Sequence, residues 1–443
     1  MSKVKTGLIV LLAGLAIYLS SQLWFANTSS RNFFYTFFTR SQSPDSSDDK
    51  IFVQPYRLIL NYGNNRFSAE YGSMSSNMLR EACDGVIQVM LKDGEYLGMQ
   101  TLNYSQVFEA PGYICEYAFD MPAAAFSSAY GKNGFADQIK NIDSIVLIPP
   151  DAVRDVTIVW LLDEVNMEMS GYSVKQPLPP ITTNPNDLIQ EVIYESSALS
   201  SYDFEDKNTF IAKKPKENYE YPTVSLVNPY AGNELLMSAI EKNVNMFFEN
   251  PAAKLDYMGD NNVYTFADAE TVVKYYQNDV LEYSNYRMGD SDAGLLNSFS
   301  IALNFIKSDK LVINEYYLAD FTQQGDDYNF DFDYVVSGFP MILPDEYKRD
   351  DMQNGAARLD HSIEITVRDG TVVNYKKIVY NFITDKSYRT AALDFRQIMD
   401  GIGDTGTQEK ISDVLLGYKL DRSNKACLYW IICLGGQTLS KIA

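Results

Sequence analysis

Residues 1–30 contain one long apolar segment, which divides the chain into a membrane element and a body. No charged residue occurs between Lys5 and Arg31, and residues 7–19 are almost purely apolar. With its flanks, this segment reaches the roughly 20 residues that a helix needs to cross a hydrocarbon core of about 30 Å. The sequence therefore predicts a single transmembrane helix near the N-terminus.

Charges and aromatic residues beside the segment predict its orientation. Lys3 and Lys5 precede it, and no basic residue follows until Arg31, so the N-terminus is expected in the cytoplasm and the main body outside the cell membrane. A cleaved signal peptide ending near Ala26, as in a secreted solute-binding protein, is the alternative. The outer interface of the bilayer suits the aromatic residues that end the segment, which are Tyr18, Trp24 and Phe25.

Small residues repeat on one face of the predicted membrane helix. Gly7, Gly14 and Ser21 recur every seven residues, so they form a stripe where a second helix can approach closely. Gln22 adds a hydrogen-bonding group near the outer end. A simple anchor is the other interpretation, because Gly and Ala are common in membrane helices.

The body outside the membrane is strongly acidic and nearly free of histidine. The chain of 443 residues has 37 Lys and Arg, 58 Asp and Glu and one His, which gives a net charge of −21. Without Lys3 and Lys5 the charge is 35 − 58 = −23. Nucleic acid and anionic lipid surfaces require a basic footprint, so we expect no nucleic-acid partner, and contact with the lipid bilayer through the N-terminal helix alone.

Apolar periodicity predicts an α+β body made of antiparallel sheets with helices on one face. A proline cluster at residues 177–180 ends a first unit, and the order helix followed by antiparallel meander then occurs twice. The predicted units are residues 1–30 (cytoplasmic start and membrane helix), 31–180 (with a stalk), 181–293 and 294–443. Helices are predicted over residues 76–91, 186–198, 233–250, 295–306 and 390–399.

Candidate catalytic and metal-binding residues are few, and we expect no cofactor and no metal. A His-based hydrolase would have to use His361, but no Gly-x-Ser-x-Gly elbow accompanies it, so a structural role is expected. Two Ser-x-Lys pairs, at residues 308–310 and 423–425, fall in polar loops. A carboxylate pair of the glycosidase type stays open. Alternation along a strand would align Asn329, Asp331 and Asp333 as a calcium-binding row or a solvated face.

Four Cys residues are spread thinly along the chain, so the fold does not depend on a disulfide framework. Cys83 and Cys115 are candidates for pairing. Cys427 and Cys433 flank a predicted strand that would separate them by roughly 20 Å, which is beyond bonding distance.

Several short motifs are shared with one known protein family. They are Ser21-Gln-Leu-Trp24, Phe247-Phe248 with Pro251, Tyr264-Thr-Phe-Ala-Asp268, Val272-Val-Lys-Tyr-Tyr276, Leu281-Glu-Tyr283 with Asn285, Gly417-Tyr418 and Tyr429-Trp430-Ile431. With these motifs the chain resembles the YycH family, the membrane-anchored regulators of the WalK–WalR two-component system that controls the cell wall. The resemblance is most specific over residues 240–290. Asp279 stands where the family has a turn Gly, and Tyr429 stands where it has a Pro.

The resemblance implies a non-enzymatic function. A YycH-like protein acts with its relative YycI, and both associate in the membrane with the sensor histidine kinase WalK, partly through packing of transmembrane helices. The prediction is therefore a single-pass regulator of a sensor kinase that works through membrane-helix and extracytoplasmic protein contacts. The alternative is an anchored glycan-binding module or peptidoglycan hydrolase, motivated by the 58 acidic residues and 32 tyrosines.

Overall fold

The computed structural model describes most of the chain beyond residue 51, and the predicted transmembrane helix lies outside this described part. The described residues are 52–64, 66–70, 74–131, 139–179, 181, 190–194, 210–215, 223–230, 236–258, 262–287, 289, 293–336, 339–344, 347–348, 355–385, 411–420, 425–434 and 437–442.

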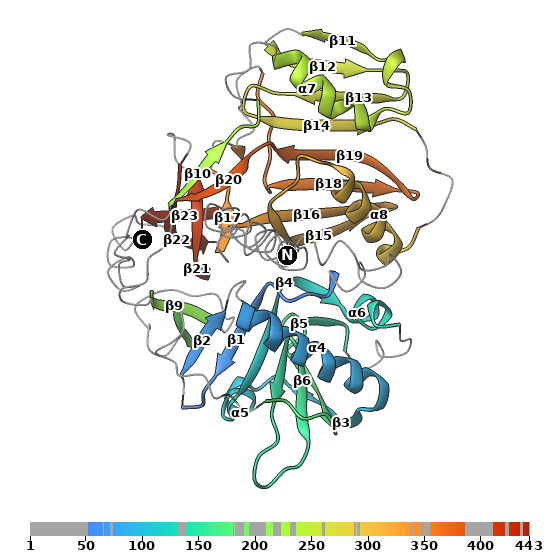
Figure 1. Cartoon of the computed structure of the whole chain (residues 1–443). Coiled ribbons are helices and arrows are strands. Elements are labelled where there is room, and N and C mark those ends of the chain that lie inside the picture. Colours follow the sequence, from blue (N-terminus) through green and yellow to red (C-terminus); the bar gives the residue numbers. More distant parts are fainter. Residues whose placement is uncertain are drawn as a thin grey trace, which may run out of the picture. The chain divides into compact units, whose positions relative to one another are not determined.

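Two large sheets contain the described strands (Figure 1). The first has nine strands in the order β3-β7-β6-β5-β4-β1-β2-β8-β9, and its neighbouring strands are antiparallel throughout. Their bounds are β1 Arg57–Asn61, β2 Phe67–Glu70, β3 Glu95–Thr101, β4 Gly112–Pro122, β5 Asn141–Ile148, β6 Thr157–Asp163, β7 Glu168–Val174, β8 Gln190–Tyr194 and β9 Phe210–Pro215.

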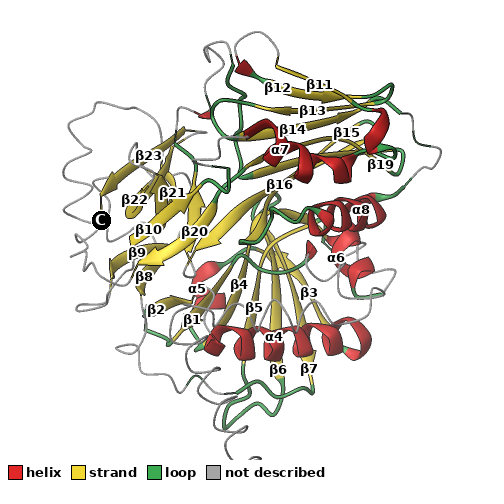
Figure 2. Ribbon diagram, turned by 45° about the horizontal axis from the view of Figure 1, so that its top comes forward, coloured by secondary structure: helices red, strands yellow, loops and turns green. Residues whose placement is uncertain are grey.

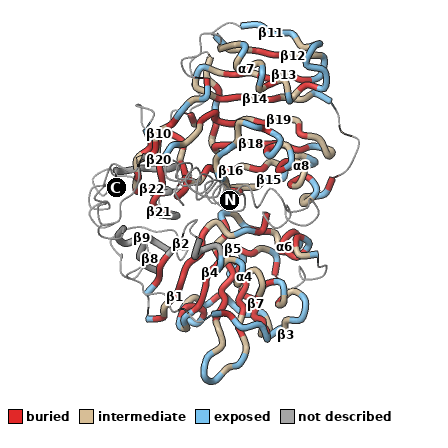
Figure 3. The backbone as a smooth tube through the Cα atoms, viewed as in Figure 1, coloured by how far each residue is buried: buried red, intermediate tan, exposed pale blue. Residues whose placement is uncertain are grey.

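Helix α4, Met74–Asp93, lies across one face of the first sheet (Figure 2). Its inner face is formed by residues at helical spacing, which become buried because they pack on the strands; these residues are Cys83, Val86, Ile87 and Met90. The short helices α5, Tyr104–Phe108, and α6, Ala123–Ala129, follow in the connections of β3 to β4 and of β4 to β5. Strand β1 is buried along its whole length, as Figure 3 shows.

The second sheet has fourteen strands among the described residues. One pair, β17 with β21, is parallel; the other strand pairs among the described residues of this sheet are antiparallel. The bounds are β10 Thr223–Val227, β11 Leu255–Met258, β12 Tyr264–Ala267, β13 Thr271–Tyr275, β14 Val280–Asn285, β15 Glu315–Gln324, β16 Asp327–Val336, β17 Phe339–Ile342, β18 Ile363–Arg368, β19 Thr371–Ile378, β20 Asn381–Asp385, β21 Ile411–Leu420, β22 Lys425–Leu434 and β23 Gln437–Ile442.

Two helix-and-meander units form one end of the second sheet, from the end strand β11 to β16. In the first unit α7, Leu236–Val244, and the short helices η3, Asn245–Phe247, and η4, Pro251–Ala253, precede β11 to β14. In the second unit α8, Leu295–Ser308, precedes β15, β16, β18 and β19. The last strands of the two units, β14 and β19, pair with each other. The stacked rings of Phe247 and Phe305, 5.6 Å apart, place η3 and the C-terminal end of α8 on the same face of the sheet.

Aromatic side chains connect the start of the described chain to the second sheet. Phe52 lies 4.9 Å from Phe299 of α8 and 6.0 Å from Phe321 of β15, measured between ring centroids. Phe321 also contacts Phe119 of β4. Edge-to-face and stacked rings of this kind bury large apolar areas, so α8 and β15 are held against the segment that leads into β1.

The α+β class with mainly antiparallel sheets agrees with the sequence prediction. Helices predicted over residues 76–91 and 295–306 are confirmed as α4 and α8, and α7 confirms part of the helix predicted over 233–250. The helix predicted over 186–198 is wrong, because β8 occupies this segment and pairs with β2. The apolar residues of this segment fit both the helical and the strand period, and pairing with β2 favours the strand. Residues 390–399 lie outside the described chain, and the division at residues 30, 180 and 293 stays a prediction.

Candidate functional site

The residues predicted to act in the membrane are not among those described. They are the helix-contact residues Gly7, Gly14, Ser21 and Gln22 and the interface residues Tyr18, Trp24 and Phe25. Within the described part of the chain, no helix combines the length and apolar character that a membrane span requires. The membrane predictions therefore stay predictions, and the described candidate site is the surrounding of the single histidine.

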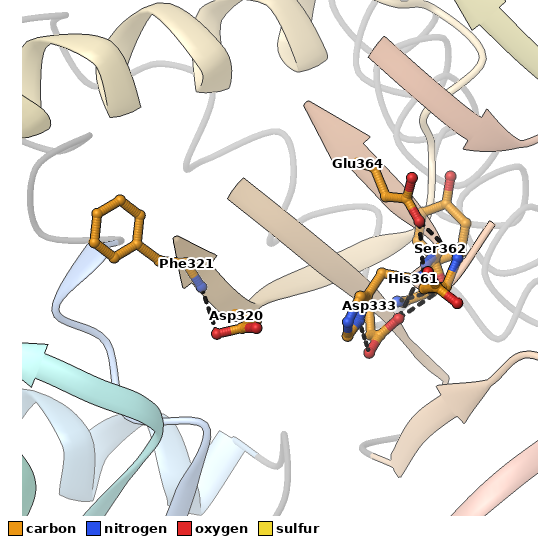
Figure 4. Close-up of polar contacts among 8 residues, drawn as sticks. Asp320, Phe321, Asp333, His361, Ser362 and Glu364 are labelled. Atoms are coloured by element: carbon orange, nitrogen blue, oxygen red, sulfur yellow. Dashed lines mark hydrogen bonds and ion pairs between the residues drawn. The ribbon is translucent and has the colours of Figure 1, made fainter. Parts of the chain in front are cut away.

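His361 lies just before β18 and contacts Asp333 of β16 (Figure 4). Its Nδ1 is 3.0 Å from Oδ2 of Asp333. The backbone N–H of Ser362 donates to the other carboxylate oxygen at 3.0 Å, and the Ser362 hydroxyl donates to the same oxygen at 3.3 Å. Register between β16 and β18, with Phe332 opposite Ile363, brings these strand ends together. Both oxygens of Asp333 thus accept hydrogen bonds from protein groups.

The two partners stabilise each other's charged forms. Burial alone would lower the pKa of His361, but the Asp333 carboxylate outweighs it and raises that pKa to about 9. Burial would raise the pKa of Asp333, but the His361 imidazolium and its hydrogen bond keep that pKa below the usual value. At neutral pH His361 is therefore a cation held by a carboxylate, which is unsuited to act as a general base.

Three carboxylates form a row across neighbouring strands beside this ion pair. Asp331 of β16 stands opposite Asp320 of β15 and opposite Glu364 of β18. Burial is the largest effect and raises the pKa of Asp331, whereas the nearby His361 cation lowers it. The Glu364 and Asp320 carboxylates raise it further, and the resulting pKa is about 7. Like charges directly opposite each other destabilise a sheet, so a proton bound at Asp331 relieves this repulsion.

The oxygen-rich row predicted on β16 is used for internal hydrogen bonds. Asn329 Oδ1 accepts a hydrogen bond from the Thr366 hydroxyl at 2.8 Å, and Asp333 is bonded to His361 and Ser362. Across the described residues, no group of three or more His, Cys, Asp or Glu side chains is arranged to hold a metal ion. In this row the geometry favours a structural network over a calcium site.

The first Ser-x-Lys pair lies at the end of α8. The Ser308 hydroxyl donates to the backbone carbonyl of Phe305 at 2.7 Å, as helix-terminal serines commonly do. Ser423 of the second pair lies outside the described residues. The hydroxyl of Ser308 is therefore engaged with its own helix and does not point toward a base.

A buried ion pair between β19 and Asp309, the residue that follows α8, escaped the sequence prediction. Nζ of Lys377 lies 2.6 Å from Oδ2 of Asp309, and each side chain is 1% exposed. The Tyr375 hydroxyl donates to the same oxygen at 3.0 Å. The available signal was the alternation of β19, because Lys377 shares a face with Tyr375, and a lysine on a buried face requires a partner.

Comparisons with known proteins show likeness at the level of structure. No family model and no curated protein matches the sequence. YycH from Bacillus subtilis is 11% identical and superimposes with a TM-score of 0.58, covering 89% of this chain and 97% of that one. Two further structures match too weakly to support an argument. An uncharacterized protein from Eubacterium rectale is 14% identical with a TM-score of 0.34, and the match covers 56% of this chain and 88% of that one. The C-terminal domain of YpeB from Bacillus megaterium is 15% identical with a TM-score of 0.25, and the match covers 46% of this chain and 92% of that one. The resemblance to YycH seen in the sequence is thus confirmed for the fold: the chain has a YycH-like fold.

Proposed function

We propose that this protein is a non-enzymatic, membrane-anchored regulator of a sensor histidine kinase of the WalK type. The observation that carries the proposal is the YycH-like fold, which extends over 89% of the chain. The motifs over residues 240–290 that resemble the YycH family also support it. They lie in the first helix-and-meander unit of the second sheet.

The chemistry of the described site supports a structural role for its ionisable groups. His361 is protonated at neutral pH and held by Asp333, and both Asp333 oxygens accept internal hydrogen bonds. The net charge of −21 also disfavours adhesion to anionic wall polymers. Specific contact with another protein accounts for these properties better than turnover of a glycan.

Regulation requires that the protein bind one kinase conformation more tightly than another, because equal binding would shift no equilibrium. In our proposal the stripe of Gly7, Gly14 and Ser21 packs on a helix of the kinase or of a YycI-like partner, and Gln22 hydrogen-bonds near the outer end. The anchors that set the depth of the helix would be Tyr18, Trp24 and Phe25.

The proposal is tested by co-purification of the full chain with the kinase from detergent-solubilised membranes. Replacing Gly7, Gly14 and Ser21 together by Leu should reduce the recovered kinase at least tenfold. Ala16→Leu is the matched control, because at about 100° per residue it adds bulk on the opposite side of the helix from Gly7. Undiminished kinase recovery with the triple variant would rule out the membrane-helix mechanism.

The hydrolase alternative is tested on purified peptidoglycan. The full chain in detergent should release no soluble fragments over hours, as measured by chromatography of the supernatant. Release that is lost in the Asp331→Asn variant would replace the regulator by an enzyme, because Asp331 is the acid of the carboxylate row that titrates near neutral pH.

A further inference from the structure

Two of the four cysteines meet in the core of the first sheet. Cys83 lies on α4 and Cys115 on β4, and each is 1% exposed. The Cys83 side chain is hydrogen-bonded to that of Cys115, and both are thiols in this structure. The contact therefore joins two elements that lie far apart in the sequence.

The surroundings of the thiols are those of a packed helix–sheet interface. Cys115 stands opposite Leu58 of β1 and Ile145 of β5, so it occupies an interior strand. Asp84, the next residue of α4, accepts a hydrogen bond from Tyr130 at 2.7 Å. Packing on the strands and the Tyr130 hydrogen bond fix the position of α4 on the sheet. The side chains of Cys83 and Cys115 are therefore held next to each other.

We propose that Cys83 and Cys115 are a disulfide-forming pair that ties α4 to β4 when the body is outside the cytoplasm. This location rests on the proposed function; the pairing chemistry does not. The oxidant is a disulfide of the glutathione or oxidoreductase class. Two S–H bonds break and one S–S bond forms, while the two electrons and two protons pass to the oxidant's disulfide, which becomes two thiols.

Burial determines when the reaction occurs. The hydrogen bond with Cys115, followed by burial, raises the pKa of Cys83 well above that of a free thiol. Since the thiolate is the attacking species, the folded chain should react slowly and the bond should form during folding. The bond would close the segment from 83 to 115, which carries β3 and α5. Such a closure stabilises mainly by restricting the unfolded chain.

The experiment uses the full chain purified in detergent, reduced and refolded with either reduced or oxidised glutathione. Free thiols are alkylated under denaturing conditions, and the peptides are mapped by mass spectrometry. We expect a linked Cys83–Cys115 peptide only with oxidised glutathione, and a melting temperature about 5 °C higher than in the reduced chain. Cys427→Ser is the matched control and should leave both results unchanged.

Two results would overturn the pairing: alkylation of both cysteines after oxidative refolding, or linkage of either to Cys427 or Cys433. Equal melting temperatures of the two refolded samples would overturn the stabilising effect of the bond. The comparison of oxidised with reduced wild type needs no variant, so a poorly folding Cys83→Ala protein does not affect it. Kinase co-purification is measured separately, and its failure would leave the disulfide result standing.

Discussion

Tyr283 and Tyr375 lie opposite each other in register on β14 and β19, the strands that join the two helix-and-meander units. The ring of Phe305, on α8, lies 5.1 Å from each of the two tyrosine rings. Phe247, which follows α7, stacks on Phe305 from the other unit. The two units therefore share one aromatic cluster, so they are expected to unfold together.

Phe305→Ala should lower the free energy of unfolding by about 3 kcal/mol, because it removes the ring that touches both tyrosines and leaves a cavity. Urea denaturation followed by tryptophan fluorescence measures the change. Asn304→Ala, at the exposed neighbouring position of α8, is the control and should change stability by less than about 0.5 kcal/mol. A loss of the same size in both variants would contradict a shared core.

The buried Lys377–Asp309 pair predicts an asymmetry between single and double substitutions. Lys377→Met should cost about 3–5 kcal/mol, because it leaves the Asp309 carboxylate buried without its cation. Adding Asp309→Leu should recover part of that loss, since two apolar groups need no partner. The free energies of unfolding of the three proteins form the test. Lys376→Met, on the opposite face of β19, is the control and should be nearly neutral.

His361 predicts a pH dependence of stability with a defined sign. Its folded pKa of about 9 exceeds the ordinary value of about 6.5, so the ion pair with Asp333 stabilises fully below pH 6.5 and loses this effect as the pH rises to 9. The His361→Gln variant should therefore be less stable than wild type by roughly 1–2 kcal/mol at pH 6 and nearly as stable as wild type at pH 10. The expected difference in free energy is this small because the imidazole is 29% exposed, so solvent screens the ion pair.

Melting temperatures of both proteins between pH 6 and 10 measure this difference. Asp331, with a pKa of about 7, and Asp143, with a pKa of about 8, also bind protons more tightly in the folded chain. They make both proteins less stable as the pH rises. The difference between the two curves removes the Asp143 contribution and reports His361 together with Asp331, whose pKa His361 lowers. Parallel curves across the whole range would show that the histidine is not coupled to Asp333.

The turn residue Asp279 combines a backbone conformation that favours glycine with several side-chain hydrogen bonds. It has a φ of 60° in the β13–β14 turn, a conformation that favours glycine. Its carboxylate accepts hydrogen bonds from the hydroxyls of Tyr275 at 2.6 Å and Tyr380 at 2.8 Å, and from the side-chain amide of Asn228. These bonds explain why an aspartate, and not a glycine, occupies this left-handed position.

Asp279→Gly should therefore destabilise the protein by about 1–3 kcal/mol, because the lost hydrogen bonds exceed the relief of backbone strain. Met167→Gly is the matched control: it has a φ of 54° and a side chain 48% exposed, so the same replacement should be neutral or stabilising. Unfolding in urea measures both. Stabilisation of the Asp279 variant would mean that the carboxylate contributes less than the strain costs.

Local patterns allowed much of the fold to be predicted. The alternation of β18 and β19 around Arg368-Asp369-Gly370 and the helical spacing in α4 and α8 depend on residues near in sequence, so these elements were recognisable. The segment of β8 was not, because its strand character comes from pairing with β2, more than 100 residues earlier. The candidate site shows the same limit: His361 was visible as the single histidine, but Asp333 as its partner was not.

The sequence by itself determined the acidic body, the single histidine, the alternation that makes antiparallel hairpins and the likeness to the YycH family. Only the tertiary structure decided that β14 pairs with β19, that Lys377 meets Asp309 and that Cys83 meets Cys115. The physical reason is that an apolar period reports which face of an element is buried, but not which element covers it. Which element covers that face depends on packing between residues far apart in the chain, and the same packing determines which group lies next to a buried charge or thiol.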